Sequence, residues 1–386
     1  MGANASAAQA ILEELVAFDT TSHKTNLPLI AYVREFLSKH DVDVELIHDA
    51  SGQKANLFAT IGPAGVSGVG LSGHTDVVPV EGQIWATDPF SLTERDGRLY
   101  GRGACDMKGF LACSLAAVPM FQARKLSSPI HILFSYDEEV GCTGVRPMIA
   151  ELGERLTAPR IIIVGEPTSM RVVDAHKGAC RFETLVTGRE AHSSMSHIGV
   201  NAIQYAGELI AQLRRIEADL PRDERAERFT PPLSTVHVGT IEGGTAMNIV
   251  PKRCKFNWEV RPLPGATSME VLHRFNCYVE EDVLPRMHAV DGNADVVTQV
   301  SNDIPAFDAG SESKAVSLAH ALAGQNQTFA VSYMTEAAWF QDAGHSTVVC
   351  GPGDIAQAHT PDEFIEIAQL EKCMGFMQQL AAWASA

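Results

Sequence analysis

The sequence predicts an α/β fold, with a mostly parallel sheet covered by helices on both faces and a smaller β-α-β-β-α-β unit inserted into it. Three observations support this fold class. Over residues 1–176, short apolar runs rich in β-branched residues alternate with helical patterns. Over residues 177–303, the strand patterns are apolar on one face only. Over residues 304–386, the first pattern returns and continues to the end of the chain.

The first part contains four runs that are typical of strands buried on both faces. These runs are NLFATIG, GVGLSG, IHILFSY and RIIIVG. Segments with helical spacing, such as KGFLACSLAAVPMFQARK, lie between them. Because ligands of such sheets bind where parallel strands end, the residues that follow these runs are the first candidates for a functional site.

The inserted part alternates half-exposed strands with two amphipathic helices. The strands are predicted in ACRFETLVTG, LSTVHVGTIEG, RCKFNWEVR and ADVVTQV, and the helices in NAIQYAGELIAQLRRIEADL and SMEVLHRFNCYVEEDVL. In the last part, FAVSYMTEAAWFQDAG and STVVCGPG predict strands that run into loops. The segment DEFIEIAQLEKCMGFMQQLAAWA predicts a long terminal helix, which Pro361 is expected to help start.

Composition excludes several classes of protein. The net charge of the 386 residues is −17, which argues against a nucleic acid partner, because binding of phosphates requires clustered Lys and Arg. No apolar stretch is expected to reach the ~20 residues that span a membrane. The first 18 residues lack the basic start and apolar core of a signal peptide. Eight scattered cysteines without a C-x-x-C motif predict a cytoplasmic protein with reduced, mostly buried thiols.

Acidic and imidazole side chains recur at the predicted strand ends. His74 and Asp76 lie in SGHTDVVPV, Asp106 in YGRGACDMKG, Glu166 in VGEPT, and His359 in the loop AHTPDE. Three of them have a plain alternative when taken alone. His74 suits a surface position, Asp106 a helix N-cap, and His359 a structural position in its loop. Glu166 ends a buried strand, where a carboxylate is costly to desolvate unless it is paired or coordinated.

The segment SYDEEVGCTG places three acids in a row after the run IHILFS. Adjacent negative charges repel one another, yet no Lys or Arg lies within five residues on either side, and Arg146 is the nearest downstream. A metal ion is therefore favoured as the compensating charge. Glu138 and Glu139 point to opposite sides, so one can bind a metal while the other faces a substrate as a proton shuttle.

Taken together, these oxygen and nitrogen ligands suit Zn²⁺ or Co²⁺. Five ligands exceed the needs of one tetrahedral ion. Two ions that share one carboxylate fit better, and such pairs activate water for hydrolysis.

These motifs resemble those of the M20 family of di-zinc amidohydrolases and peptidases. The matching segments, in the order of the family, are SGHTDVVPV, DGRLYGRGACDMKGF, DEEVGCTG, GEPT, GREAHSSM and AHTPDE. The resemblance implies two zinc ions per subunit, for which cobalt can substitute. The implied ligands are His74 and Glu166 on one ion, Glu139 and His359 on the other, and Asp106 on both. Glu138 would be the general base and then the general acid, and Asp76 would orient His74. A non-proline cis peptide bond is implied at Asp106–Met107.

Residues 1–176 and 304–386 would then form the catalytic domain, and residues 177–303 a lid or dimerisation domain of a homodimer. The motif GREAHSSM places His192 as a donor to the developing oxyanion, acting from the partner subunit, with an ordinary loop residue as the alternative. Asn248 and Arg261 would lie near the substrate. Arg261 suits a substrate carboxylate because its planar fork binds two oxygens, and a structural salt bridge is the alternative. Glu336 would contact a substrate ammonium or the edge of the metal site.

Within the family, SYMTEAAWFQDAG and GPGDIAQAHTPDEF look most like enzymes that deacetylate N2-acetyl-L-ornithine. The implied reaction of this metal-dependent amidohydrolase is hydrolysis of that small N-acyl amino acid to L-ornithine and acetate, a step of arginine biosynthesis. The alternatives within the family are a succinyl-diaminopimelate desuccinylase, an aminoacylase, and a dipeptidase or carboxypeptidase. From another class, the alternative is a non-catalytic binding protein on the same fold.

Overall fold

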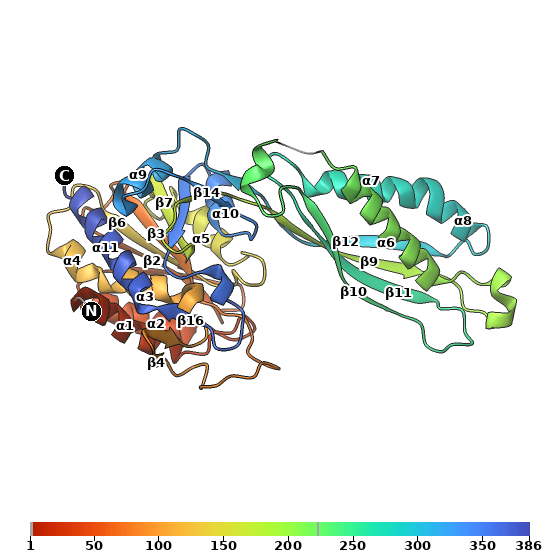
Figure 1. Cartoon of the computed structure of the whole chain (residues 1–386), viewed down its shortest axis with the longest axis horizontal. Helices are drawn as coiled ribbons and strands as arrows, with labels where there is room; N and C mark the ends of the chain where they lie inside the picture. The colour runs from red at the N-terminus through yellow and green to blue at the C-terminus, as the bar shows by residue number, and fades with distance from the viewer. Residues whose placement is uncertain (1–2, 222–223) are drawn as a thin grey trace. The chain divides into compact units, whose positions relative to one another are not determined.

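A computed structural model of the chain describes residues 3–221 and 224–386, and residues 1–2 of the N-terminal segment and residues 222–223 lie outside it. The chain divides into two compact units (Figure 1). The first unit comprises Met1–Asp174, Asp308–Phe329 and Thr335–Ala386, and the second comprises Ala175–Phe307 and Ala330–Met334.

The first unit is built on one large sheet. Its strands are β1 (Val44–His48), β2 (Ala55–Ile61), β3 (Val69–His74), β6 (Ile130–Ser135), β7 (Ile161–Pro167), β8 (Val173–His176), β13 (Phe307–Asp308), β14 (Phe329–Val331) and β15 (Ser346–Gly351). The order is β1-β2-β6-β3-β7-β15-β8-β13, with β14 paired to β8. The central strands β6, β3, β7 and β15 are parallel, whereas β1 and β2 are antiparallel to their neighbours. The predicted α/β class with a mostly parallel sheet is confirmed.

Helices cover both faces of this sheet. They are α1 (Ala3–Val16), α2 (Leu27–Ser38), η1 (Ala104–Lys108), α3 (Gly109–Ala116), α4 (Val118–Gln122), α5 (Val145–Glu151), α9 (Lys314–Ala323), α10 (Ala337–Asp342), η5 (Ile355–Gln357) and α11 (Ile367–Trp383). On one face, α1, α2, α3, α4, α9 and α11 share a core with strand residues such as Leu71, Ile163 and Val348. The buried residues of α5 and α10 lie outside this core, and α10 contacts α5, β7 and β15. Because neighbouring residues of a strand face opposite sides, α5 and α10 cover the other face.

The segment Ala104–Gln122 corrects the expectation that no stretch is long and apolar enough for a membrane span. It has 19 residues and passes that test by length and composition, but 83% of its most apolar window is buried inside the protein. The segment contains α3, which packs against α1, α11 and strands β3 and β7. A helix that is apolar on all sides is what a position enclosed by other elements requires. The eight cysteines are all free, and only Cys277 among them is not buried, as expected.

A small sheet of β4 (Thr93–Arg95), β5 (Arg98–Tyr100) and β16 (Phe364–Glu366) adjoins η1. Its strand β16 lies between Pro361 and α11, so the expectation that Pro361 helps to start the terminal helix is wrong. The backbone after Pro361 pairs with β5, Phe364 opposite Tyr100, before it turns helical at Ile367.

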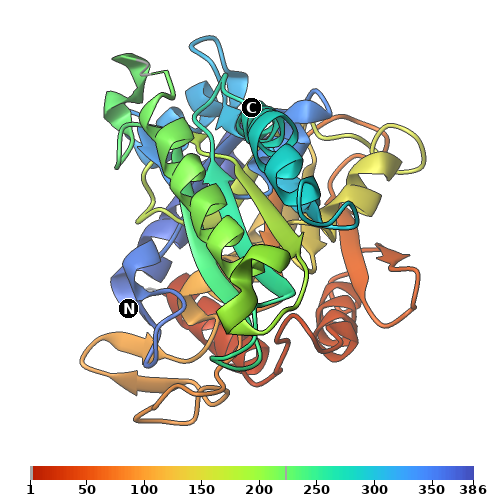
Figure 2. The ribbon, with the colours of Figure 1, turned by 90° about the vertical axis from the view of Figure 1, so that its right-hand side faces the viewer.

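The second unit has an antiparallel sheet in the order β10-β11-β9-β12. The strands are β9 (Ala179–Thr187), β10 (Thr235–Gly243), β11 (Arg253–Arg261) and β12 (Asp295–Ile304). The helical segments are η2 (Ser193–Ile198), α6 (Ala202–Ala218), η3 (Glu224–Arg228), α7 (Ser268–Tyr278), η4 (Val279–Val283) and α8 (Leu284–His288). Figure 2 shows the helices on one face of the strands, where their apolar sides form a separate core around Phe182, Phe256 and Trp258. The opposite face of the sheet is polar and partly exposed.

Strand β6 carries His131, which gives the first unit a predictable response to acid. His131 is 0% exposed and stacks on Phe58 with 5.4 Å between ring centroids. Burial lowers its pKa to about 4, whereas the unfolded chain has the ordinary value of 6.5. The neutral form therefore stabilises the fold above pH 6.5, and that stability is lost as the pH falls through about 4. At 1.36 kcal/mol per pKa unit, the loss is up to about 3 kcal/mol.

We expect the variant His131→Leu to lose less stability than the wild type between pH 7 and pH 4. Chemical denaturation of the metal-free protein at both pH values measures this difference. The exposed residue His23, changed to leucine, is the control. An identical pH dependence in wild type and His131→Leu would contradict the role of His131.

Candidate metal centre

The side chains predicted at the strand ends meet at one edge of the first unit's sheet. His74 is the last residue of β3, Glu138 and Glu139 follow β6, and Glu166 is near the end of β7. The loop that carries His359 follows β15. Because β3, β6, β7 and β15 are parallel, their carboxyl ends lie at the same edge.

Asp106 lies between two histidines. Its Oδ1 is 3.1 Å from Nε2 of His74, and its Oδ2 is 3.4 Å from Nε2 of His359. It follows Gly103, whose φ of 78° turns the chain into this segment, and its own φ of −121° and ψ of 94° are extended. The helix that follows has Lys108 as its N-cap, so Asp106 does not cap it. The peptide bond Asp106–Met107 is cis, as the resemblance implied.

Two groups of ligand atoms form around Asp106. Glu166 Oε1 is 3.7 Å from Nε2 of His74. On the other side, Glu139 Oε2 is 3.1 Å from Nε2 of His359. Each group therefore holds one imidazole and one glutamate, and its imidazole lies beside an oxygen of Asp106. Ligand atoms of His74, Asp106 and Glu139 also lie within 4.8 Å of one another.

Glu138 is adjacent to both groups but differs from Glu139 in its contacts. Its side chain is buried, and its Oε1 lies 3.3 Å from Sγ of Cys142, which can donate a weak hydrogen bond. A ligand atom of Glu138 also lies within 4.8 Å of ligand atoms of His74 and Glu166. Its position allows it either to bind a cation or to handle a proton beside one.

Asp76 organises both strand ends, although through different atoms from those expected. The main-chain oxygen of Asp76 is 2.9 Å from Nδ1 of His74, whereas its carboxylate is 3.6 Å away. The carboxylate accepts hydrogen bonds from the backbone amides of Glu138 at 3.1 Å and Glu139 at 3.3 Å, and from the hydroxyl of Ser22 at 2.8 Å. The carbonyl therefore orients His74, and the carboxylate holds the loop that carries the two glutamates.

The pKa values of the acidic side chains reflect their burial close to one another. Burial raises the pKa of Glu138 and Glu166 well above the usual range, and it raises the pKa of Glu139 to about 7. Burial acts in the same direction on Asp106, but hydrogen bonds from His359 and His74 outweigh it and hold the pKa of Asp106 below its usual value. Four carboxylates, those of Asp106, Glu138, Glu139 and Glu166, meet only two imidazoles here, so the cluster can accept further positive charge.

The residues fit divalent cations. Glu166 Oε1 is buried and has no hydrogen-bond partner, although it points toward the cluster. An unpaired buried carboxylate oxygen is costly, and a bound cation would satisfy it. The donors are imidazole nitrogens and carboxylate oxygens, the set that zinc and similar ions take. Two ions could share Asp106 and take one histidine and one glutamate each.

The structure also supplies a cation that sequence reasoning missed. Lys54 Nζ forms an ion pair with Asp137, the first of the three consecutive acids, and donates to the main-chain oxygen of Ser22. The two paired residues are 83 positions apart in sequence. The cation that compensates Asp137 therefore comes from a distant part of the chain, and no local sequence pattern predicts Lys54.

Glu336 is the N-cap residue of α10, and its side chain is buried, with 1% of the residue exposed. Burial raises the pKa of Glu336 to about 7, although a hydrogen bond from Ser135 and the charge of His74 act in the opposite direction. Of the two expectations for Glu336, this favours the edge of the metal site over a contact with a substrate ammonium.

The other expected site residues belong to the second unit. His192 is exposed, and its Nδ1 accepts hydrogen bonds from the hydroxyl of Ser194 at 2.8 Å and the amide of Ser194 at 3.2 Å. The segment of Asn248 lies beside it, because the amide of Ser193 donates to the oxygen of Asn248 at 3.0 Å. Arg261 forms an ion pair with Glu259 at 3.0 Å, which is the alternative considered for it.

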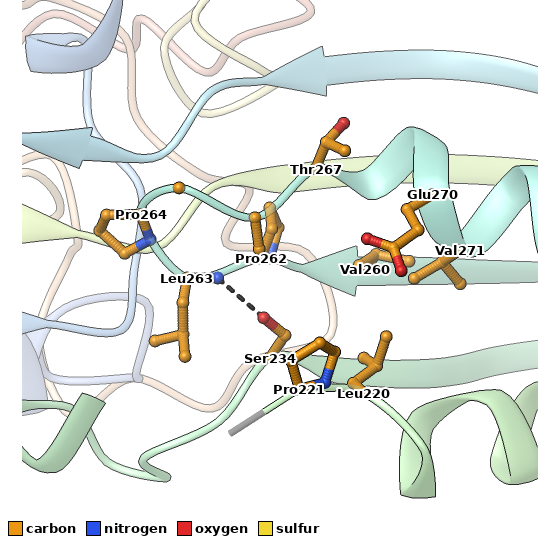
Figure 3. A pocket seen from close by; sticks show the side chains of 12 residues that line it. Leu220, Pro221, Ser234, Val260, Pro262, Leu263, Pro264, Thr267, Glu270 and Val271 are labelled. Carbon is orange, nitrogen blue, oxygen red and sulfur yellow. Dashed lines mark hydrogen bonds between the residues drawn. The ribbon is translucent and has the colours of Figure 1, made fainter. Parts of the chain in front are cut away.

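A pocket in the second unit does not have the chemistry of a metal centre (Figure 3). Its lining is mostly apolar, with Leu220, Val260 and Pro262 among the side chains. Glu270 is its one acidic side chain, and the amide of Leu263 donates a hydrogen bond to the hydroxyl of Ser234 at 2.9 Å. Within the described residues, the groups that could hold a metal all lie in the first unit.

The chain is similar to known proteins over most of its length. The sequence profile of peptidase family M20/M25/M40 matches residues 70–383. Acetylornithine deacetylase of Myxococcus xanthus is 37% identical over 387 residues, which cover 97% of each chain.

Among solved structures, the M20 family metallo-carboxypeptidase Sso-CP2 from Sulfolobus solfataricus has a TM-score of 0.77 at 18% identity and covers 100% of both chains. The YXEP protein of Bacillus subtilis, a dinuclear metal binding peptidase, has a TM-score of 0.65 at 15% identity and covers 99% of this chain and 98% of its own. At sequence identities of 18% and 15%, these two comparisons show similarity of the fold alone.

Proposed function

The chain belongs to peptidase family M20/M25/M40 and is a metal-dependent amidohydrolase, and we propose that it hydrolyses N2-acetyl-L-ornithine to L-ornithine and acetate. The proposal of a hydrolase rests on one observation: the two groups of candidate metal ligands meet at Asp106. The relative from Myxococcus xanthus, named acetylornithine deacetylase, supports the choice of substrate, because the alignment covers 97% of each chain.

Two zinc ions, or cobalt in their place, would be held by His74 with Glu166 and by His359 with Glu139, and Asp106 would bind both. When bound, such ions act as Lewis acids and lower the pKa of a water molecule toward neutrality. The donor types support this assignment. So does the dinuclear metal binding stated for the YXEP protein of the same fold.

Glu138 would take the proton from the attacking water and deliver it to the leaving amine. Its burial supports this role, because a carboxyl group with a raised pKa can hold a proton near neutral pH. Asp76 would keep Glu138 in place through the backbone amide and keep His74 oriented through its carbonyl.

The second unit would serve as the lid and dimerisation domain of a homodimer. His192 from one subunit would donate a hydrogen bond to the oxyanion formed in the other. Asn248 would lie beside His192. Arg261 would leave its ion pair with Glu259 and bind the carboxylate of the substrate instead. The exposure of His192 and the neighbouring segment of Asn248 support this arrangement.

If the site is shared, mixing His192→Ala chains with Glu138→Ala chains should restore activity. Each mixed dimer would contain one site with both residues intact, so random pairing gives about a quarter of the wild-type sites. The rate of acetate release after co-refolding measures this. Mixed dimers that form but stay inactive would rule out action in trans.

The substrate is tested by comparing kcat/KM for N2-acetyl-L-ornithine, succinyl-diaminopimelate, N-acetyl-L-methionine and a dipeptide. We expect the highest value for N2-acetyl-L-ornithine, loss of activity after chelation, and recovery with zinc or cobalt. A higher value for another substrate would replace the proposed acyl specificity. Activity that survives removal of all metal would overturn the metal centre itself.

We also place the protein in the cytoplasm, acting on a small molecule without a nucleic acid partner. The eight free cysteines and the net charge of −17 support this. Cell fractionation that finds the chain outside the cytoplasm would contradict it.

A further inference from the structure

We propose that the buried ion pair Arg102–Glu363 positions the two loops that carry Asp106 and His359, and that it thereby sets the affinity of the centre for divalent cations. Arg102 and Glu363 are positioning residues, because they act on the ligands through the backbone. The inference rests on the proposed function, since it takes Asp106 and His359 as ligands of the metal centre.

Glu363 holds the segment of Asp106. Its Oε1 accepts hydrogen bonds from the backbone amides of Cys105 at 2.9 Å and Asp106 at 3.0 Å. Its own main-chain oxygen accepts from the amide of Gly101 at 2.9 Å. One glutamate thus fixes the chain on both sides of the turn that presents the carboxylate of Asp106.

Arg102 holds the loop of His359. Its Nη1 donates to Glu363 Oε2 at 2.7 Å and to the main-chain oxygen of Thr360 at 3.3 Å. Its Nη2 donates to the amide oxygen of Gln83, and Gln83 in turn donates to the main-chain oxygen of His359 at 2.9 Å. The two peptide groups that follow His359 are therefore held by the same guanidinium group, the first through Gln83 and the second directly.

The conformation of His359 shows why this support is needed. Its φ is 62°, in the left-handed region that residues with a side chain rarely adopt. A loop in such a conformation persists when surrounding contacts determine it. Arg102 and Glu363 provide those contacts from the interior, since each side chain is 1% exposed, and Trp85 covers the guanidinium at 4.9 Å from its ring centroid.

The planar fork of arginine suits this task. One guanidinium group reaches Glu363, Thr360 and Gln83 in different directions, which a lysine ammonium on a flexible stem does not reproduce. Groups that orient the ligands of a metal site typically account for about 10–100-fold in metal affinity.

The small sheet of β4, β5 and β16, which lies next to Arg102 and Glu363 in the chain, offers a matched control. Arg98 on β5 and Glu366 on β16 are register partners, and they form an exposed ion pair at 3.9 Å with 45% and 48% of their side chains accessible. The variant Glu366→Gln removes a charge from this sheet without touching either ligand loop.

The experiment uses the full chain, stripped of metal and titrated with zinc in competition with a chromophoric chelator. We expect Glu363→Gln to weaken zinc binding about 10–100-fold, Arg102→Lys to weaken it by less, and Glu366→Gln to leave it unchanged. The absorption bands of bound cobalt should shift in Glu363→Gln. At saturating zinc, kcat should recover, because all the ligands are still present.

The proposal would be overturned if Glu363→Gln bound zinc as tightly as the wild type, showed the same cobalt bands, and differed only in a lower unfolding temperature. The ion pair would then have a purely structural role. If Glu363→Gln does not fold, Gln83→Ala decides, because Gln83 is partly exposed and acts on the loop of His359 alone. Gln83→Ala should weaken the binding of one of the two zinc ions, and unchanged zinc binding would overturn the proposal. Failure of the proposed function looks different, because the wild type itself would then bind no zinc.

Discussion

Replacement of Glu138 by glutamine is expected to lower kcat about 10²–10⁴-fold while the metal content stays at the wild-type value. Glutamine keeps the shape of the side chain but cannot carry a proton from water to the leaving amine. The surroundings of Glu138 are fixed by its backbone contact with Asp76 and by Cys142, so the variant should keep the local structure. Steady-state kinetics with N2-acetyl-L-ornithine and metal analysis of the same sample measure both quantities.

The neighbouring variant Glu139→Gln is the control, and it should lose metal rather than only turnover. The alternative is that Glu138 binds a metal ion, because one of its ligand atoms lies within 4.8 Å of ligand atoms of His74 and Glu166. If Glu138→Gln loses a metal ion and Glu139→Gln does not, the two glutamates have exchanged roles. If Glu138→Gln keeps both its metal and its turnover, another residue handles the proton.

The α/β fold could be predicted because the strands of the first unit are unbroken apolar runs. IHILFS and RIIIVG have apolar residues on both faces, and β6 and β7 are indeed central strands with every residue buried. Short elements were harder. The segment FAVSYMTEAAWFQDAG was expected to be a strand that runs into a loop; Phe329–Val331 does form β14, but Ala337–Asp342 forms α10. Six residues carry too little periodicity to separate a helical turn from a strand end.

The gathering of ligand-type residues at one edge could also be predicted, because parallel strands end at the same edge of a sheet. A strand end locates His74, Glu139 and Glu166 to within a few residues. It does not say which contacts hold them. The ion pairs Lys54–Asp137 and Arg102–Glu363 join residues 83 and 261 positions apart, and such pairings follow from the completed fold rather than from any local pattern.

The largest effect on metal binding is expected from Asp106→Ala, which should lose both ions and reduce activity to that of the metal-free enzyme. Catalytic zinc sites keep three protein ligands. Without Asp106, the group of His74 and the group of His359 would keep two each. Metal analysis after dialysis against a weak chelator measures the loss. Glu166→Ala and Glu139→Ala are the matched controls, because each should release only one ion.

Asp106→Ala can also be examined without metal. This tests whether Asp106 lies beside His359, independently of metal binding and catalysis. Hydrogen bonds to Asp106 and then to Glu139 raise the pKa of His359 to about 10, so His359 is protonated at neutral pH in the metal-free protein. Removal of Asp106 takes away the larger contribution, and the pKa of His359 should fall toward its ordinary value of 6.5. An NMR titration of the histidines measures this shift. An unchanged titration would mean that Asp106 does not lie beside His359 in solution, and a carboxylate away from that imidazole could not join two ions.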